Sequence, residues 1–312
     1  MTTTDDRRAS RRDGVLVVDK PAGPTSHDIV DRARRVLHER RIGHTGTLDP
    51  FATGVLALCV GKATRLARFL AEGEKEYQAS VRLGFATTTD DLGGRPLGEP
   101  RPVAVSRATL DAALAGLVGE FDQVPPAFSA KHVGGRRLYE LARRGETVPL
   151  AAIRVVLHAI EVASFAGERL ELVVRCSPGT YVRALARDLG ERLGTGGHLT
   201  GLRRTRSGEF SLAEAVTVED LDAGAVRLVP LAELLPRLPA VRLPAASLEL
   251  VRHGRVLGPE ALAGAFPEPA VERVRLLDEA GRLVALAVPK DAGLGGALPR
   301  RAQLHADVVL LD

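Results

Sequence analysis

Hydrophobic and polar positions follow two different periods in the N-terminal part of the chain, which predicts a mixture of strands and helices. Residues 15–19 begin with four apolar side chains and are typical of a buried strand. Residues 25–41 repeat apolar side chains at helical spacing behind a plausible N-cap at Thr25 or Ser26, so we expect an amphipathic helix. Residues 75–84 alternate apolar and polar side chains with a period of two, which predicts a half-buried strand.

Later segments extend this mixture. Apolar side chains recur at helical spacing over residues 110–117 and again over residues 180–189, and they alternate with polar ones over residues 170–176. The predicted strands and helices do not follow a regular βαβ repeat. The sequence therefore predicts an α+β fold, with a mostly antiparallel mixed sheet flanked by helices.

The composition changes between residues 228 and 245, where prolines interrupt a leucine-rich segment. We expect the domain boundary there, with a large domain over residues 14–238 and a small β-rich domain over residues 239–312. The second part contains short apolar runs separated by glycine and proline. Residues 1–13 are polar and rich in arginine without any periodicity, which predicts a disordered basic tail.

The charge of the chain suits a polyanionic partner without requiring one, since the net charge is +4 and the pI is near 9.4. The distribution of cations is more informative, because they gather in residues 131–144 and again after the glycine-rich turn at residues 194–197. A solvated charged helix is the alternative interpretation of the first cluster. Together the clusters favour a track for a phosphate backbone. The cations expected on this track are Lys131, His132, Arg136, Arg137, Arg203 and Arg204.

Several classes of protein are disfavoured. Cys59 and Cys176 each lie inside an apolar run, which predicts core residues and no disulfide or metal site. No apolar stretch approaches the length of a membrane span, and no apolar segment follows the basic N-terminus, so we expect a soluble cytoplasmic protein. The histidines lack zinc-ligand spacing and no glycine-lysine phosphate loop occurs. We therefore expect neither a metal nor another cofactor.

Residues 43–56, with the sequence GHTGTLDPFATGVL, form the segment most suggestive of chemistry. They place one carboxylate, Asp49, between two regular elements on a loop lined by glycines, and Pro50 stiffens the position after the acid. An isolated Asp-Pro pair more often begins an ordinary turn. A loop with this density of glycine and proline is typical of a binding site.

This segment resembles the catalytic loop of the bacterial tRNA pseudouridine-55 synthases, the TruB-type enzymes, whose pattern is close to G-H-T-G-x-L-D-P-x-A-T-G-x-L. The resemblance covers nearly the whole chain and becomes weak after residue 239. It continues through DKPAGPTS at residues 19–26, KEY at 75–77, PPAFSA at 125–130, GTYVR at 179–183 and LRRT at 202–205. It implies the pseudouridine synthase fold, with a C-terminal module of the PUA type that binds RNA. From its pattern alone, that module is equally consistent with a plain stabilising domain.

The resemblance also implies roles for three catalytic residues. Asp49 corresponds to the catalytic aspartate, which is generally called the nucleophile; attack on C1′ and removal of the C2′ proton remain open. Arg183 corresponds to the arginine that keeps this carboxylate ionised, whereas its spacing alone also fits an exposed helical arginine. Tyr77 corresponds to the tyrosine that stacks on the target base, and its hydroxyl is a second candidate for the proton transfer from C5. By position alone, Tyr77 is equally well an ordinary core aromatic.

Further residues are implied in holding the substrate. Tyr181 would line the uridine pocket and Leu202 would close it. His44 would fill the gap that the flipped base leaves in the RNA. Lys20 would support the cleft, with a direct phosphate contact as a second possibility.

One departure from the family pattern concerns the segment over residues 131–150, which the resemblance implies grips RNA. The family pattern S-A-x-K is replaced here by Ser-Ala-Lys-His, so that Lys131 precedes His132 at the usual lysine position. Which of the two cations contacts RNA is left open, and a contact through His132 would depend on pH.

The activity implied is the conversion of uridine 55 to pseudouridine in the T-arm of tRNA by base flipping, in a monomer that needs no protein partner. Two alternatives remain: a guide-dependent synthase that modifies ribosomal RNA, and a tRNA-folding chaperone with little or no catalysis. A glycosidase with paired carboxylates is disfavoured, because Asp90 and Asp91 lie in a polar loop without a visible arranged partner.

Overall fold

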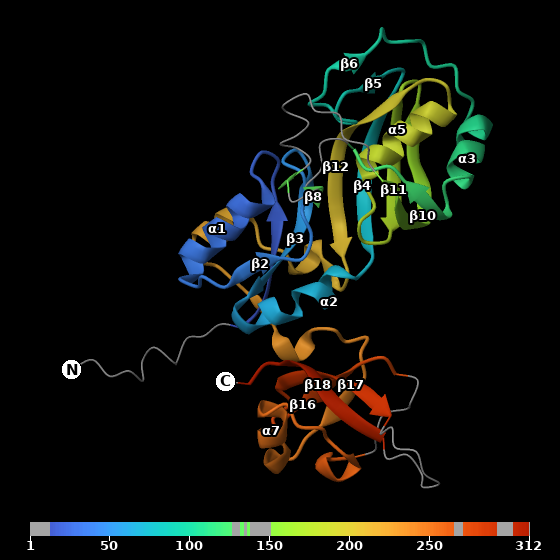
Figure 1. Cartoon of the computed structure of the whole chain (residues 1–312). Coiled ribbons are helices and arrows are strands. Elements are labelled where there is room, and N and C mark those ends of the chain that lie inside the picture. Colours follow the sequence, from blue (N-terminus) through green and yellow to red (C-terminus); the bar gives the residue numbers. More distant parts are fainter. Residues whose placement is uncertain are drawn as a thin grey trace.

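The computed structural model describes residues 13–126, 132–133, 136–137, 151–264, 271–291 and 302–311. Its larger part is built on a ten-stranded sheet, and its smaller part on a four-stranded sheet formed by the C-terminal residues (Figure 1). The large sheet has the order β14-β1-β3-β12-β4-β11-β10-β7, with β2 added to β3 and β13 added to β12.

The strands of the large sheet are β1 (Gly14–Lys20), β2 (Ile42–His44), β3 (Thr53–Val60), β4 (Lys75–Leu83), β7 (Gly119–Gln123), β10 (Ile153–Ala166), β11 (Arg169–Cys176), β12 (Gly197–Ser207), β13 (Phe210–Ser211) and β14 (Leu228–Pro230). Among the described residues of this sheet, β3 and β12 form the one parallel pair, and the other pairs are antiparallel. The prediction of an α+β fold with a mostly antiparallel mixed sheet is confirmed.

The helices are α1 (Ser26–Leu37), α2 (Ala67–Ala71), α3 (Arg107–Ala115), α5 (Val182–Arg192), α6 (Val218–Asp222) and α7 (Ala245–Arg252), with the 3-10 helices η1 (Gly61–Leu66), η2 (Leu212–Glu214), η3 (Leu231–Glu233) and η4 (Pro259–Ala261). Two short hairpins lie outside the main sheets. They pair β5 (Ala86–Thr87) with β6 (Pro96–Leu97), and β8 (His132–Val133) with β9 (Arg136–Arg137).

The first helix shows how local sequence determines an element boundary. Thr25 caps α1, and its hydroxyl accepts a hydrogen bond from the Asp28 amide while the Asp28 carboxylate accepts one from the Thr25 amide. The helix ends at Leu37, and its C-cap residue His38 adopts the left-handed conformation with φ 51°. It is therefore shorter than the predicted range of residues 25–41. The predicted helix over residues 180–189 is found as α5, two residues later at its start and three at its end.

Two cores cover different faces of the large sheet. One core lies beneath α1, α3, α5 and α6, and a second lies on the opposite face beneath η1 and α2. Residues of β1 alternate between them, since Leu16 and Val18 belong to the first core and Val15 and Val17 to the second. Burial on both faces explains why this strand is a continuous apolar run in the sequence.

Strand β4 is buried on one face only, so its sequence alternates as predicted. Its buried face carries Lys75, Tyr77, Ala79, Val81 and Leu83. Cys59 and Cys176 are fully buried free thiols, which confirms the prediction that both belong to the core. No helix within the described ranges is long and apolar enough to cross a membrane.

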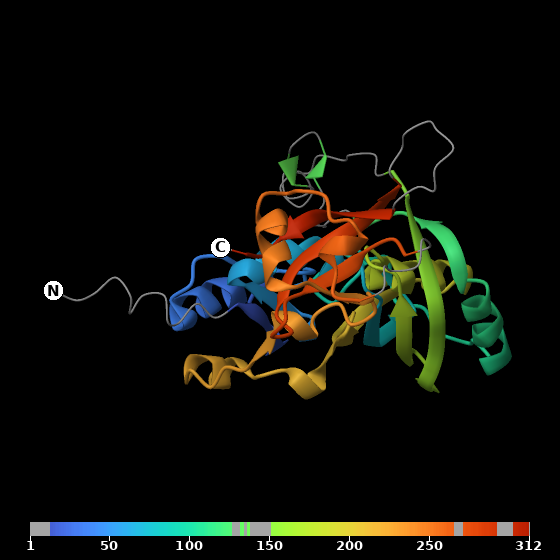
Figure 2. The same cartoon turned by 90° about the horizontal axis from the view of Figure 1, so that it is seen from below.

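The C-terminal sheet has the order β15-β16-β17-β18 and consists of β15 (Ala240–Arg242), β16 (Val274–Leu277), β17 (Leu283–Asp291) and β18 (Ala302–Val309). It lies below the end of the large domain that carries α2 (Figure 1), and in the view from below it stands in front of the large domain (Figure 2). Leu283, Leu286 and Leu310 enter the second core of the large sheet. The Arg68 guanidinium forms an ion pair with the Asp307 carboxylate at 2.8 Å across the same junction. The two sheets therefore share one apolar interface.

Candidate active site

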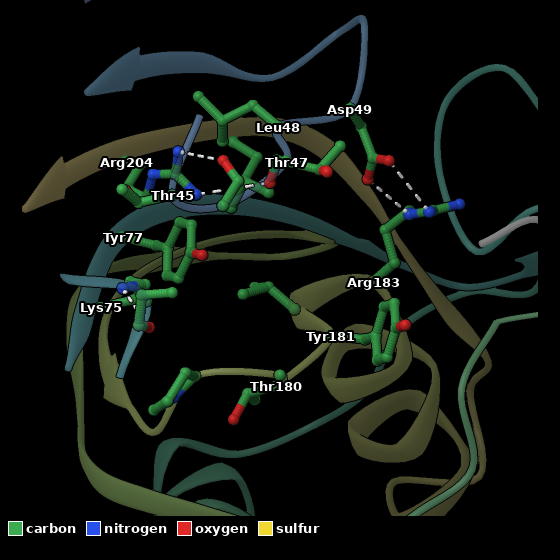
Figure 3. A pocket seen from close by; sticks show the side chains of 16 residues that line it. Thr45, Thr47, Leu48, Asp49, Lys75, Tyr77, Thr180, Tyr181, Arg183 and Arg204 are labelled. Carbon is green, nitrogen blue, oxygen red and sulfur yellow. Dashed lines mark hydrogen bonds and ion pairs between the residues drawn. The ribbon is translucent and has the colours of Figure 1, made fainter. Parts of the chain in front are cut away.

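A pocket of about 440 Å³ opens between β4, β12, the loop that follows β2 and the segment that leads into α5 (Figure 3). Six of the residues predicted to act at the site line it. They are Asp49, Tyr77, Tyr181, Arg183, Leu202 and Arg204. The fold thus gathers side chains from distant parts of the chain around one cavity.

The loop that carries Asp49 is anchored from below by α1 and β1. The hydroxyl of Ser26, the first residue of α1, donates to the Leu48 carbonyl at 3.0 Å and accepts from the Leu48 amide at 2.8 Å. The Lys20 ammonium, at the end of β1, donates to the Pro50 carbonyl at 3.2 Å and to the carbonyls of Pro21 and Pro24 at 2.8 Å each. Asp49 therefore stands between two residues whose backbones are fixed.

The return of this loop into the sheet requires a glycine at position 54. Gly54 has φ +101°, and a Cβ atom there would lie 2.1 Å from the carbonyl oxygen of Arg204 on the neighbouring strand. This position is also the point at which β3 pairs in parallel with β12. Only glycine combines this conformation with so close a backbone approach.

The Asp49 carboxylate is held by Arg183. The Arg183 Nε lies 2.9 Å from Oδ2 of Asp49, and its Nη2 donates to Oδ1 at 3.2 Å (Figure 3). The arginine is 5% exposed, whereas a third of the aspartate side chain still reaches solvent through the pocket. Two nitrogens of the guanidinium thus fix both carboxylate oxygens and leave the acid facing the cavity.

A second carboxylate binds the other side of the same guanidinium. Arg183 Nη1 lies 3.3 Å from Oδ2 of Asp91 and donates to the Thr89 carbonyl at 3.2 Å. Asp90 in turn forms an ion pair with Arg187 at 3.0 Å, one turn further along α5. The sequence interpretation that Asp90 and Asp91 lack an arranged partner is wrong. Their partners lie on a helix far along the chain, where local spacing gives no sign of them.

Burial raises the pKa of Asp49, and Arg183 opposes that rise while Asp91 adds to it. Because the chemistry expected of Asp49 requires its ionised form, kcat/KM should fall as the pH is lowered through a pKa above that of an ordinary aspartate, which is about 4. A pH profile of single-turnover rates checks this. Activity that stays constant down to about pH 4 would contradict the expected rise.

Tyr77 and Tyr181 form the walls of the pocket that a planar ring would contact. Tyr77 is 8% exposed, and burial raises the pKa of its phenol, so the hydroxyl stays neutral and the ring serves better as a platform than as a base. Tyr181 is fixed through its backbone, because the buried Gln123 side chain donates to its carbonyl at 3.1 Å and accepts from its amide at 2.8 Å. Leu202 lies on the rim of the same pocket.

Two of the predicted cations are buried: Arg204, which was expected to contact phosphate, and Lys20, for which a phosphate contact was the second possibility. Arg204 is 2% exposed and donates to the backbone carbonyls of Val55, Gly46 and Thr47, so it clamps the Asp49 loop and cannot lie on an RNA track. Lys20 is fully buried, and its ammonium donates to three proline carbonyls. This excludes the direct phosphate contact and agrees with a supporting role. Arg203 does not line the pocket; it is 37% exposed and pairs with Asp19 at 2.6 Å.

His44 ends β2, just before the Asp49 loop. Its Nδ1 atom is buried without a hydrogen-bond partner among the described residues, and burial lowers its pKa, with Arg204 adding to the effect. The imidazole is therefore neutral near pH 7.

The remaining predicted RNA contacts are not tested. His132 belongs to β8, and Arg136 and Arg137 form β9, but only their backbone is described. Lys131 lies outside the described residues. Across the described ranges, no group of three or more His, Cys, Asp or Glu side chains is placed to hold a metal ion.

Residues that the sequence interpretation missed also line the pocket: Thr45, Thr47, Lys75, Pro178 and Thr180. The position of Lys75 could have been predicted, because the period of two places it on the same face of β4 as Tyr77. The others belong to loops whose paths are determined by tertiary contacts.

Comparisons with known proteins extend these observations. Residues 34–182 match the model of the TruB family pseudouridylate synthase N-terminal domain, and residues 183–235 match the tRNA pseudouridylate synthase B C-terminal domain. The chain is 47% identical over 285 residues to tRNA pseudouridine synthase B of Thermobifida fusca, covering 88% of this chain and 94% of that one. It is 45% identical over 306 residues to the protein of the same name from Ralstonia nicotianae, covering 95% and 96%.

Solved structures show the same fold. A chain of the H/ACA RNP bound to a substrate RNA containing 2′-deoxyuridine superposes with a TM-score of 0.71 at 25% identity, covering 98% of this chain and 87% of that one. A chain of a Cbf5-Nop10-Gar1 complex gives a TM-score of 0.71 at 26% identity, covering 97% and 87%. The similarity spans both the large and the small sheet.

Proposed function

Because the chain belongs to the TruB family of pseudouridylate synthases, we propose that it isomerises uridine 55 of tRNA to pseudouridine. Its substrate is RNA, and the target would be the uridine in the T-loop. The observation that carries this proposal is the Asp49 carboxylate, which faces a pocket of about 440 Å³ and is held on both oxygens by Arg183. The buried aromatic face of Tyr77 lines the same pocket.

The isomerisation breaks the N1–C1′ bond, turns the base and joins C5 to C1′, with no net change of oxidation state. Asp49 serves this chemistry in one of two ways: its oxygen attacks C1′ and forms an ester, or it removes the C2′ proton. In both cases the ionised carboxylate must act on the ribose. Arg183 favours that ionised form and orients the two oxygens.

The base enters the pocket only after it leaves the folded T-loop. Flipping a base out of its stack costs a few kcal/mol, which contacts inside the protein must offset. Tyr77 supplies a flat stacking surface, Tyr181 and Leu202 border the pocket, and the neutral ring of His44, next to the Asp49 loop, suits the position vacated in the RNA. Lys20 supports this arrangement from beneath the loop.

RNA outside the pocket would be held by two further parts of the chain. We assign residues 14–238 to the catalytic domain, whose segment 131–150 grips RNA, and residues 239–312 to a PUA-like domain that contacts tRNA. The separate C-terminal sheet, which begins at Ala240, supports that division. The partly exposed Arg203 remains a proposed backbone contact, and residues 1–13 a proposed basic tail.

We further propose that the protein acts as a cytoplasmic monomer without a guide RNA or a protein partner. The named relatives match it over nearly their full length and are tRNA pseudouridine synthases. The guide-dependent alternative has support in the similarity to chains of H/ACA and Cbf5 complexes, at lower identity.

The test is to incubate an unmodified tRNA transcript with the protein alone and to map pseudouridine by carbodiimide labelling and primer extension. We expect conversion at position 55, with none in a matched transcript that carries cytidine there. Conversion that requires added guide RNA and accessory proteins would favour the guide-dependent alternative. Tight binding without conversion would favour the folding chaperone.

A further inference from the structure

The side of the pocket that lies away from Asp49 carries two buried cations, Arg204 and Lys75. Lys75 and Tyr77 share the inward face of β4, and Arg204 of β12 is the direct cross-strand partner of Tyr77. All three line the pocket. Figure 3 shows Arg204, Tyr77 and Lys75 along one side, and Asp49 and Arg183 along the other.

Neither of these cations has a carboxylate partner within the part of the chain that the structure describes. Arg204 is 2% exposed and donates to the backbone carbonyls of Val55, Thr47 and Gly46. Lys75 is 5% exposed, and its ammonium donates to the carbonyls of Gly73 at 2.7 Å and Ala71 at 3.1 Å. Arg183, equally buried, is instead neutralised by two carboxylates.

A buried charge without a counterion is costly, so two such charges side by side call for an explanation. Burial lowers the pKa of Lys75 to about 8, with Arg204 and Arg237 adding to the effect and Cys176 opposing it. The positive charges of Lys75 and Arg204 therefore repel one another. An anion placed against Tyr77 would relieve this repulsion.

The proposed reaction creates such an anion, which makes the following inference dependent on the proposed function. When the N1–C1′ bond breaks, its electron pair leaves with the base and spreads over N1, O2 and O4 of uracil. Asp49 loses its charge in the same step, either by forming an ester bond to C1′ or by taking the C2′ proton. One negative charge thus moves from the Asp49 side of the pocket to the base, whichever route is followed.

We propose that Arg204 and Lys75 form an electrostatic site for the detached uracil ring, and that they offset its negative charge between the cleavage of N1–C1′ and the formation of C5–C1′. Arg204 has a second duty, because it also clamps the Asp49 loop. Lys75 holds only the turn before β4, so its substitution separates the electrostatic role from the positioning of Asp49.

The experiment compares two T-arm hairpins that carry either uridine or 5-fluorouridine at the target position. The electron-withdrawing fluorine stabilises the ring anion by itself, so cleavage should depend less on the protein's cations. We expect Lys75→Met to slow the single-turnover loss of the uridine N-glycoside by about 100-fold, a magnitude typical of a lost electrostatic donor, and that of 5-fluorouridine by about 10-fold or less. Nuclease digestion and chromatography measure both rates.

Control variants separate charge from packing. Lys75→Arg should restore most of the uridine rate, because it retains the cation. Arg204→Lys should slow both substrates to a similar extent, since it loosens the Asp49 loop while keeping a charge. If Lys75→Met melts well below the parent, Lys75→Gln, which keeps an N–H donor for the carbonyls, replaces it with the same expected difference between substrates.

Equal slowing of both substrates by the folded Lys75 variant would overturn this inference, as would a uridine rate within about twofold of the parent. Failure of the parent protein to convert the uridine hairpin would overturn the proposed function itself. The two failures are therefore distinguishable.

Discussion

Asp49→Asn should reduce pseudouridine formation by about four orders of magnitude or more, while leaving the fold and tRNA affinity nearly unchanged. The amide retains the shape of the carboxylate but neither attacks C1′ nor removes a proton from C2′. It still accepts a hydrogen bond from Arg183, so the loop held by Ser26 and Lys20 should keep its path. Single-turnover conversion of a tRNA transcript and filter binding measure the two effects separately.

The matched control is Asp19→Asn. Asp19 lies in β1 next to Lys20, but neither it nor its ion-pair partner Arg203 lines the pocket. This variant should keep conversion within about threefold of the parent, because only a partly exposed ion pair is lost. Substantial residual conversion by Asp49→Asn would contradict the assignment of Asp49 as the reacting group.

Arg183→Met should lower kcat by about 100- to 1000-fold, the range typical of removing a preorganised electrostatic group. The substitution leaves Asp49 and Asp91 near one another without the guanidinium that joins them. The pKa of Asp49, already raised by burial, should rise further, and a smaller fraction of the enzyme would be active at pH 7. The acid limb of the pH profile should therefore shift upward. Single-turnover rates across pH measure both changes.

Arg187→Met is the control for Arg183→Met, because Arg187 occupies the same face of α5 one turn later. It pairs with Asp90 and Asp188 and does not contact Asp49. Its loss should weaken the loop that carries Asp91, with a much smaller effect on kcat and no shift of the acid limb. An equal effect of the two substitutions would indicate that α5 acts only through packing.

The elements that could be predicted from the sequence are those determined by neighbours along the chain. The start of α1 follows from Thr25 and Asp28, because the side chain of each accepts a hydrogen bond from the backbone amide of the other. Strand β4 follows from an alternation that only one-sided burial produces. The approximate position of α5 follows from its apolar stripe, although its ends do not.

Contacts between distant segments could not be predicted in this way. Arg203 and Arg204 are adjacent cations in the sequence, yet β12 directs one toward Asp19 at the surface and the other into the pocket. The sequence does not reveal which face of that strand is buried, because both positions are arginine. The role of Asp91 could not be predicted for a related reason, because its ion-pair partner Arg183 lies on α5, far along the chain.

Periodicity does not distinguish Asp49 from the other carboxylates of the chain, whereas the resemblance to a known family does. The structure gives physical reasons for the role of Asp49: Arg183 contacts both of its carboxylate oxygens, and its loop requires a glycine at position 54. The C-terminal sheet had no sharp motif, and its packing against α2 depends on leucines that any β domain contains. Its RNA contacts therefore remain a proposal.

The most direct test of the central claim is tritium release from a T-arm hairpin labelled at C5 of the single uridine that corresponds to position 55. Forming the C5–C1′ bond expels that hydrogen, so release reports isomerisation itself. We expect stoichiometric release by the parent protein in a buffer containing a chelator and no nucleotide, and no release by Asp49→Asn that still binds the hairpin. Binding by the parent without release, or equal release by Asp49→Asn, would contradict the central claim.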